Sequence, residues 1–302
     1  MSTVVIAQAD AIGDAIVEVL EQIDLAPLVH NKIVAVKPNE TWASKDDITG
    51  VTQGDTLQAV LRALKPFEPR ELVVTGGAGA AETEDVFRLS GMMSVVEAEG
   101  ATFFDHNRPP FKEAKLTYSR DPEVKGPQRS VMVNPRVLSY DTLISLAQLK
   151  VHETATVTLS LKNIAMSYPA ADYYGHPRSE QRHENQFFED MHSFIAAMAK
   201  RFPIDLAIIA GHPAMIGIGP LGGHAFETGL VVASTDALAA DVVGSRLLGF
   251  DVQAVRHLWE AGRMELGETD VEEMKFPAMG LDAAFEAFTK AAYGHALALE
   301  HE

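Results

Sequence analysis

The stretch Thr142-Leu-Ile-Ser-Leu-Ala-Gln-Leu149, which continues as Lys150-Val-His152, decides how the rest of the chain is interpreted. Its short apolar run is typical of a buried strand. A Thr-rich apolar segment follows and leads to Lys162 and Asn163. Open α/β sheets bind their ligands at the carboxyl ends of strands and in the turns after them. A strand that ends in lysine and histidine therefore predicts a binding site.

Segments with strand and helix patterns alternate on both sides of this stretch. We expect strands at 4–6, 32–36, 72–75, 102–104, 131–133, 143–149, 205–210 and 230–234. We expect helices at 10–23, 54–64, 83–89, 187–201, 236–248, 252–263 and 282–298. This alternation predicts an α/β fold, a mostly parallel sheet with helices on both faces. We expect a single domain over 1–302, and a two-lobed form with a cleft near 130–165 stays open.

Two irregular inserts interrupt this pattern, at 106–128 and at 167–186. The first is Pro-rich and is expected to form a hairpin or a flap. The second follows Lys162 and Asn163 directly, and its tyrosines, histidines and arginines suit a binding loop. We expect it to be a mobile cover in which Arg178 meets an anionic ligand, with a static surface loop or a subunit contact as the alternative.

Composition limits the class of protein. The chain has 302 residues, 47% of them hydrophobic, which suffices for a large core. The net charge of −17 argues against nucleic acid and anionic membranes as partners. Cysteine is absent, which excludes iron–sulfur clusters and thiolate zinc sites on this chain. The N-terminus has no signal-peptide pattern and no apolar run is long enough to span a bilayer, so we expect a cytoplasmic protein; homo-oligomers stay open.

Four polar groups close the central strand and the segment after it. Lys150 and Lys162 could bind an anionic substrate or act as base or nucleophile when burial lowers their pKa. His152 could move protons, and Asn163 could donate to an oxyanion. We predict His152 and Lys162 as catalytic groups and the other two as anion-binding groups. In the alternative, both lysines are solvated and the histidine is a structural residue.

Two further strand ends add candidate anion-binding groups. Lys37 and Asn39 follow the strand at 32–36, and Gly76 and Gly77 stand between a strand and a helix. Backbone amides of such a glycine turn can face an anion. The turn lacks the lysine and hydroxyl residue of a P-loop, and a plain tight turn is the alternative.

Supporting roles are predicted for two pairs of residues. Gly217 and Gly219 belong to the glycine-rich stretch 211–223, which either shapes the pocket or is a simple crossover. Asp236 is placed to cap the next helix. Asp241 is a candidate buried carboxylate that could pair with a lysine of the site. The spacing of the histidines in the middle of the chain matches no metal-binding motif, so we assign no metal site to them. These histidines are His106, His176, His183, His192, His212 and His224.

The order of these pieces resembles the DUF362 family, a domain of unknown function. The family pattern has a strand ending in V-K-P-N, a glycine turn, K-T-H, a segment ending in L-K-N, A-M-E-G-x-G-P, and a helix with A-S-x-D-x-V-A-x-D. The matching segments of this chain are 36–39, 76–77, 150–152, 161–163, 214–220 and 233–241. The resemblance covers about residues 30–270. Val151, Gly211 and Ile216 stand where the family has Thr, Asp and Glu, and the iron–sulfur modules of many members cannot form here.

A fainter similarity links the chain to the nickel-pincer lactate racemase family, whose pattern has a histidine and then a cofactor-bearing lysine. His152 and Lys162 stand 10 residues apart, a comparable separation, but the family's Gly-Gly before the lysine is missing. From residues and resemblance together we expect an enzyme that acts on a small anionic metabolite. A non-catalytic protein that binds a small molecule, metal or cofactor in the same cleft is the alternative, and the identity of any cofactor stays open.

Overall fold

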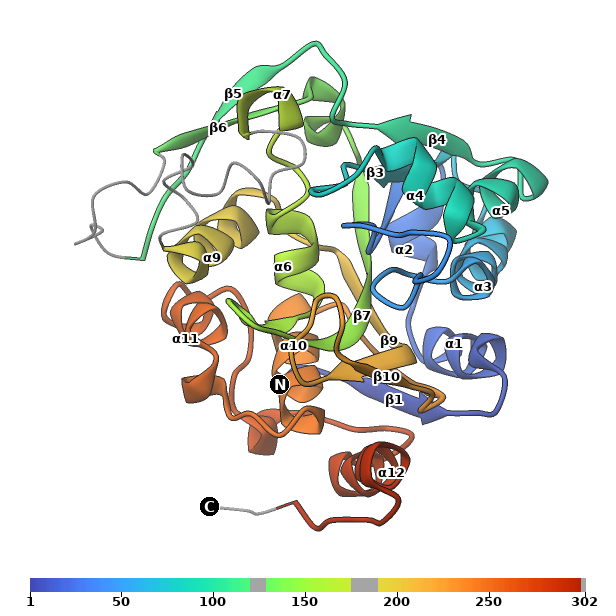
Figure 1. Ribbon diagram of the computed structural model, residues 1–302, viewed down its shortest axis with the longest axis vertical. Helices are drawn as coiled ribbons and strands as arrows, with labels where there is room; N and C mark the ends of the chain where they lie inside the picture. The colour runs from blue at the N-terminus through green and yellow to red at the C-terminus, as the bar shows by residue number, and fades with distance from the viewer. Residues whose placement is uncertain (120–128, 175–189, 300–302) are drawn as a thin grey trace.

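The computed structural model describes residues 1–119, 129–174 and 190–299, and its centre is a sheet of nine strands among these residues (Figure 1). The strand order is β1-β11-β9-β7-β2-β3-β4, while β8 pairs with β7 and β10 with β9. The strands of this sheet are β1 Val5–Gln8, β2 Ile33–Pro38, β3 Glu71–Gly76, β4 Thr102–Asp105, β7 Thr142–His152, β8 Thr156–Thr158, β9 Leu206–Ile216, β10 His224–Phe226 and β11 Leu230–Ser234.

The run from β4 through β3, β2 and β7 to β9 is parallel, and β11 and β1 extend it antiparallel. This confirms the predicted mostly parallel α/β sheet. Parallel strands put their carboxyl ends at one edge, so the ends of β2, β3 and β7 lie near one another.

Helices cover both faces of the sheet (Figure 1). The helices α1, α3 and α5 share one core with one face of the strands, and α6, α9, α10, α11 and α12 share a second core with the other. The helices are α1 Ile12–Glu21, α2 Ala26–Val29, α3 Gly54–Leu64, α4 Thr83–Leu89, α5 Met92–Ala98, α6 Ser160–Ala165, α7 Ala171–Tyr174, α9 Met191–Arg201, α10 Ala237–Leu247, α11 Arg256–Arg263 and α12 Leu281–Tyr293.

The central strand β7 joins the two cores. Side chains alternate across a strand, so Leu143 and Ala147 enter the core beneath α6 and α9, while Ile144 and Leu146 enter the core beneath α1 and α3. Burial on both faces is why apolar residues point to both sides of this strand, with Ser145 and Gln148 as buried polar exceptions.

Two strands are longer than the sequence predicts. β7 continues through His152 because its last three residues pair with β8 in a hairpin. β9 was expected to end at residue 210 but continues to Ile216, because β10 pairs with its last three residues. The predicted glycine-rich loop is therefore confined to the short turn between β9 and β10.

The first insert contains β5 Lys112–Lys115, which pairs antiparallel with β6 Ser130–Val133, as expected for a hairpin. In the second insert, Tyr168 is fully buried, and the Tyr174 hydroxyl accepts a hydrogen bond from the Met132 amide at 3.0 Å. These contacts tie 167–174 to the core, so the predicted cover cannot begin at residue 167. The remainder of the inserts, 120–128 and 175–186, lies outside the described residues, and with it Arg178.

Candidate functional site

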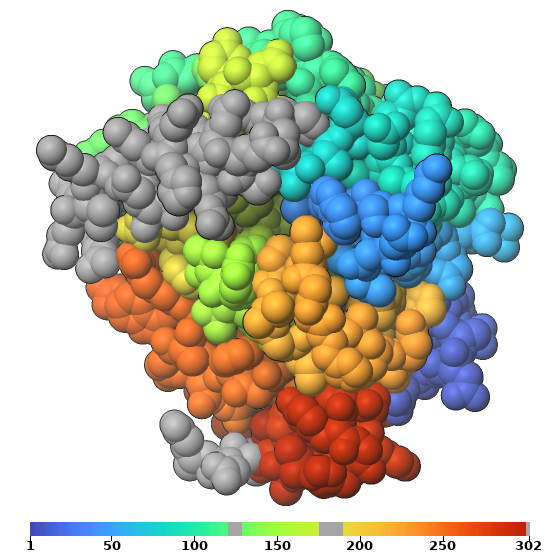
Figure 2. All heavy atoms as spheres, viewed as in Figure 1, coloured from blue at the N-terminus to red at the C-terminus, as the bar shows by residue number. Residues whose placement is uncertain are grey.

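A cavity of about 620 Å³ lies where the carboxyl ends of β2, β3 and β7 meet α6. Its walls come from five stretches of chain that are far apart in sequence: 37–41, 77–80, 152–167, Met191 and 218–221. Figure 2 shows the segment after β2, the β7–β8 turn and the β9–β10 turn meeting on one face of the molecule. The segment 130–165, where a cleft was predicted, therefore contributes only one of the walls of this cavity. A volume of this size is typical of small-molecule sites.

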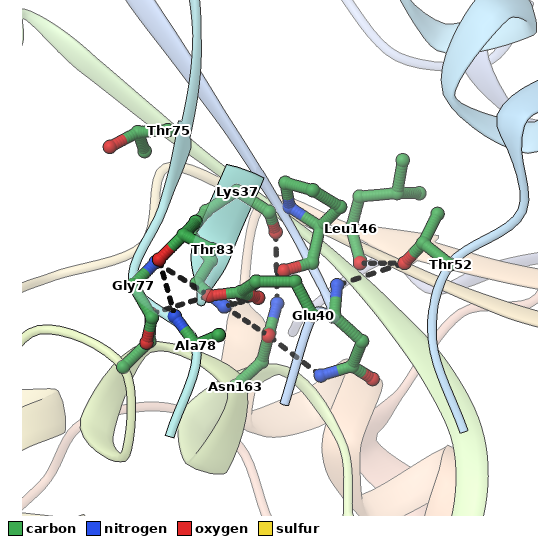
Figure 3. A network of polar contacts seen from close by, with 12 residues as sticks. Lys37, Glu40, Thr52, Thr75, Gly77, Ala78, Thr83, Leu146 and Asn163 are labelled. Atoms are coloured by element: carbon green, nitrogen blue, oxygen red, sulfur yellow. Dashed lines mark hydrogen bonds and ion pairs between the residues drawn. The ribbon is translucent and has the colours of Figure 1, made fainter. Parts of the chain in front are cut away.

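Three of the predicted anion-binding groups hold one another in a buried network (Figure 3). Lys37 Nζ donates to the Pro38 carbonyl at 2.8 Å and to Asn163 Oδ1 at 2.9 Å. Asn163 Oδ1 also accepts from Asn39 Nδ2 at 2.7 Å, and Asn163 Nδ2 donates to the Lys37 carbonyl and to Ser145 Oγ. Both N–H groups of Asn163 are therefore used inside the protein. In this arrangement neither amide hydrogen is free for the predicted role as an oxyanion donor.

Glu40 is the central carboxylate of this network, and sequence reasoning missed it. It forms a buried ion pair with Lys37, and its Oε1 accepts from the Gly77 amide at 2.9 Å and from Ser167 Oγ at 2.8 Å. The amide that was predicted to bind an external anion therefore already binds the chain's own carboxylate. The available signal was its position, directly after Asn39 at a strand end.

Gly77 is required by close packing at this point. A Cβ atom there would lie 2.2 Å from His106 Nε2, a distance that no real contact tolerates. His106 is itself fully buried, with Nδ1 2.9 Å from Thr75 Oγ1 and Nε2 3.0 Å from Ser167 Oγ. Gly76 ends β3 and does not line the cavity.

Lys150 lies behind the cavity wall rather than in it. Its ammonium donates to the Gly50 carbonyl and, at 3.1 Å, to Gln148 Oε1, and only 1% of the residue is exposed. Burial, together with the charges of Lys162 and Lys37, lowers the pKa of Lys150 to about 7. It can influence the cavity electrostatically, but the predicted direct contact with an anion is not supported by its position.

Lys162 differs from both other lysines. It lies on α6 with 7% of its surface exposed, and it lines the cavity. Within residues 1–119, 129–174 and 190–299, its ammonium has no hydrogen-bond or ion-pair partner. Burial, and secondly the nearby charge of Lys37, lowers the pKa of Lys162 from 10.5 to about 7. A buried cation without a partner is costly, which makes it the most conspicuous group of the site.

Thr158 is a second unsatisfied group on the same wall. Its hydroxyl is buried and has no hydrogen-bond partner among the described residues, and the residue lines the cavity. Buried hydroxyl groups are nearly always hydrogen-bonded, so this one indicates a missing partner. Sequence reasoning missed it, although it belongs to the Thr-rich segment that leads to Lys162.

His152 lies at the end of β7 and lines the cavity. Its Nδ1 accepts hydrogen bonds from the amides of Thr154 at 3.1 Å and Ala155 at 3.2 Å. Both contacts need a lone pair on Nδ1, so the proton of the neutral ring is on Nε2. Burial and the charge of Lys162 hold the pKa of His152 well below its usual range. The imidazole of His152 is therefore neutral, and its Nε2–H can donate a hydrogen bond.

The predicted supporting residues lie around α6 and α10. Asp241 accepts from the amides of Ser160 at 2.7 Å and Leu161 at 2.8 Å, and so holds the start of α6 instead of pairing with a lysine. Asp236 accepts from the Ala239 amide at 3.0 Å and caps α10 as predicted. The Asp241 contacts thus fix the start of the helix that carries Lys162.

Gly217 and Gly219, the glycines predicted to support the site, do not line the cavity, whereas the neighbouring Ile218 and Pro220 do. Gly219 must lack a side chain, because a Cβ atom would lie 2.1 Å from the Val151 carbonyl oxygen. The Glu153 amide donates to the Gly219 carbonyl at 2.7 Å. The β9–β10 turn is thereby held against the end of β7.

No group of three or more metal-binding side chains converges within the described part of the chain. The described central histidines lie apart: His106 contacts Ser167, His192 stacks on His257 with ring centroids 5.3 Å apart, and His212 lies between Asp55 and Glu227. His176 and His183 lie outside the described residues. Among the described helices, none is long and apolar enough to cross a membrane.

The chemistry of the cavity follows from these contacts. Glu40 balances the charge of Lys37, whereas Lys162 is not balanced by a partner in the described residues. The Lys162 ammonium, the Thr158 hydroxyl and the Nε2–H of His152 are donors that the described protein leaves unused. Three such donors suit a ligand with several acceptor oxygens and a negative charge.

Comparison with known proteins gives three findings. The family model described as "Domain of unknown function (DUF362)" matches residues 34–246. A protein of the cyanobacterium Synechocystis, called thylakoid-associated protein, is 29% identical over 249 residues, which cover 81% of this chain and 71% of that protein. A crystal structure of a protein from Thermotoga maritima aligns with a TM-score of 0.48 and 12% identity over 80% of this chain. The chain spans 60% of the length of that structure.

Proposed function

The chain belongs to the DUF362 family, and from this premise and the geometry of the cavity we propose that it is an enzyme that acts on a small anionic metabolite. The observation that carries the proposal is the unpartnered ammonium of Lys162 in a cavity of about 620 Å³. Burial of this ammonium destabilises the folded protein, and no contact among the described residues offsets that cost. A bound anion would supply the missing partner.

The proposed division of roles differs from the one that sequence alone predicted. Lys162 provides the positive charge, and the neutral His152 ring and the Thr158 hydroxyl provide hydrogen bonds that orient the anion. Lys37, Glu40 and Asn163 form the rigid wall beneath it. Because burial lowers the pKa of Lys162 to about 7, this amine can also take up or release a proton in the cavity, as a general acid or base must.

The alternative is a non-catalytic protein that binds a small molecule or cofactor in the same cavity. Such a protein would bind the anion in the same way as the proposed enzyme, but it would not convert the anion into a product. The donors of the cavity, one amine, one hydroxyl and one imidazole N–H, suit carboxylates or phosphates better than a metal ion, which needs lone pairs.

A ligand screen tests the proposal. We would measure thermal unfolding with sulfate, inorganic phosphate and a panel of small carboxylates, and then measure the affinity of each stabilising anion by calorimetry. Lys162→Met should weaken binding at least tenfold. Lys290→Met, on the exposed side of α12, is the matched control and should bind like the wild type. Anions that bind both variants equally would contradict the proposal. NMR of the bound metabolite over hours separates turnover from simple binding.

The same proposal places the protein in the cytoplasm and excludes nucleic acid as a partner. The net charge of −17 opposes phosphate backbones, and the cavity is too small for a duplex. The Synechocystis relative is named for the thylakoid, and this location is said of that protein. Submicromolar, salt-sensitive binding of an oligonucleotide would refute this part.

A further inference from the structure

We infer that Lys162 is a nucleophile that forms an imine with the carbonyl group of a small oxo acid. The inference rests on the proposed function and names the substrate class of that site. It needs three conditions: an amine that is reachable from the cavity, an amine that no internal acceptor ties down, and donors beside it for the acid group of the ligand. Lys162 meets the first two, and His152 and Thr158, which line the same cavity, supply the donors for the third.

The first two conditions distinguish Lys162 from the other buried lysines. Lys37 donates to three acceptors, including Glu40, and Lys150 donates to two from behind the wall. Lys162 lines the cavity and has no acceptor among the described residues. A carbonyl carbon that enters the cavity can therefore approach its nitrogen without first breaking a hydrogen bond of the protein.

The protonation state agrees with the geometry. An amine attacks a carbonyl only in its neutral form, and an ordinary lysine is almost fully protonated at neutral pH. Burial and the charge of Lys37 bring the pKa of Lys162 to about 7, so a substantial fraction of the amine is neutral there. A desolvated lysine close to another cation is a recognised way to activate this nucleophile.

The remaining donors place the acid group. His152, Thr158 and Lys162 line the same cavity, so the Nε2–H of the histidine and the hydroxyl of the threonine are available to a carboxylate while its neighbouring carbonyl reacts with the lysine. In the reaction, Nζ bonds to the carbonyl carbon and an amine proton moves to the oxygen. The resulting carbinolamine loses water to give the imine. No oxidant or reductant is consumed. The imine takes up one proton from solvent, and its positive charge then balances the carboxylate.

Borohydride trapping tests the inference. The full-length protein would be incubated with pyruvate or glyoxylate, reduced with sodium borohydride, and analysed by intact mass and peptide mapping. We expect one stable adduct per chain, located on Lys162, and a rate of formation that rises with pH through about 7. Acetone, a carbonyl compound without the acid group, should react at least tenfold more slowly.

Controls separate this inference from the proposed function. Lys162→Met should give no adduct and Lys290→Met the wild-type adduct. Mapping of the wild-type adduct gives the site even where a variant folds poorly. Lactate has the acid group but no carbonyl, and it should bind without being trapped. Lactate binding with no adduct from either oxo acid overturns the imine and leaves anion binding in place. An adduct spread over surface lysines overturns the imine as well. If neither lactate nor an oxo acid binds, the imine is overturned, and the proposed function fails too when sulfate and phosphate also do not bind.

Discussion

Two buried lysines of the cavity should respond to the same substitution with opposite signs. Lys37 is balanced by Glu40 and by hydrogen bonds, whereas Lys162 has no partner in the described residues. Lys37→Met leaves a carboxylate buried and unpaired, which typically costs about 3–5 kcal/mol. Lys162→Met instead removes an unpaired cation and keeps a side chain of similar length. We therefore expect it to stabilise the fold.

The size of the gain follows from the pKa. A fall from 10.5 to about 7 corresponds to a penalty of at most about 5 kcal/mol, because each pKa unit is worth about 1.4 kcal/mol. The side chain lines the cavity and is not fully shielded from solvent, so we expect a smaller gain, on the order of 2 kcal/mol. The folded-state pKa lies below that of the unfolded chain. As the pH falls, the unfolded chain is therefore protonated first, and the penalty grows from pH 10.5 down to about 7 and stays constant below.

Urea unfolding of the wild type and both variants measures this difference, with chloride as the sole added anion. At pH 7 the unfolding midpoint should rise for Lys162→Met and fall for Lys37→Met. At about pH 9.5 the gain of Lys162→Met should shrink. If Lys162→Met loses as much stability as Lys37→Met at pH 7, the ammonium of Lys162 is paired in solution and the reasoning is refuted.

Three further outcomes follow from the contacts. Gly77→Ala should lower the unfolding midpoint sharply, because its methyl group would meet His106, and an unchanged midpoint would show that this packing is wrong. Asp241→Ala should cost about 1–3 kcal/mol in urea unfolding, because two amides at the start of α6 lose their acceptor. Nitrogen NMR of His152 should show a neutral ring protonated on Nε2 from about pH 5 to 8, since its pKa is lowered; a titration within that range would contradict the assigned donor role.

Much of the fold could be predicted from local patterns. The apolar residues of β7 predict a buried strand, and the spacing of Ile12, Ile16 and Val19 predicts the helix α1. Both predictions work because burial imposes a period on the sequence. The extension of β9 to Ile216 could not be predicted, because it depends on pairing with β10, and the residues involved look like a loop on their own.

The site was partly predictable for a similar reason. Strand ends of a parallel sheet share an edge, so Lys37, His152 and Lys162 could be expected near one cavity. Which lysine is free could not be seen, because the acceptors come from distant segments: Gly50 lies 100 residues before Lys150, to which its carbonyl is bonded. The sequence also concealed that Glu40 occupies the amide of the glycine turn.

Proton uptake on binding shows whether the cavity binds an anion through Lys162. A bound anion raises the pKa of Lys162 from about 7, so at pH 8 a largely neutral amine should become charged. Calorimetric titration of the wild type with lactate, in two buffers of different ionisation enthalpy, gives the number of protons taken up. We expect the wild type to take up nearly one proton per bound anion, and Lys162→Met to take up none. Binding without proton uptake, or equal uptake in both proteins, would contradict it.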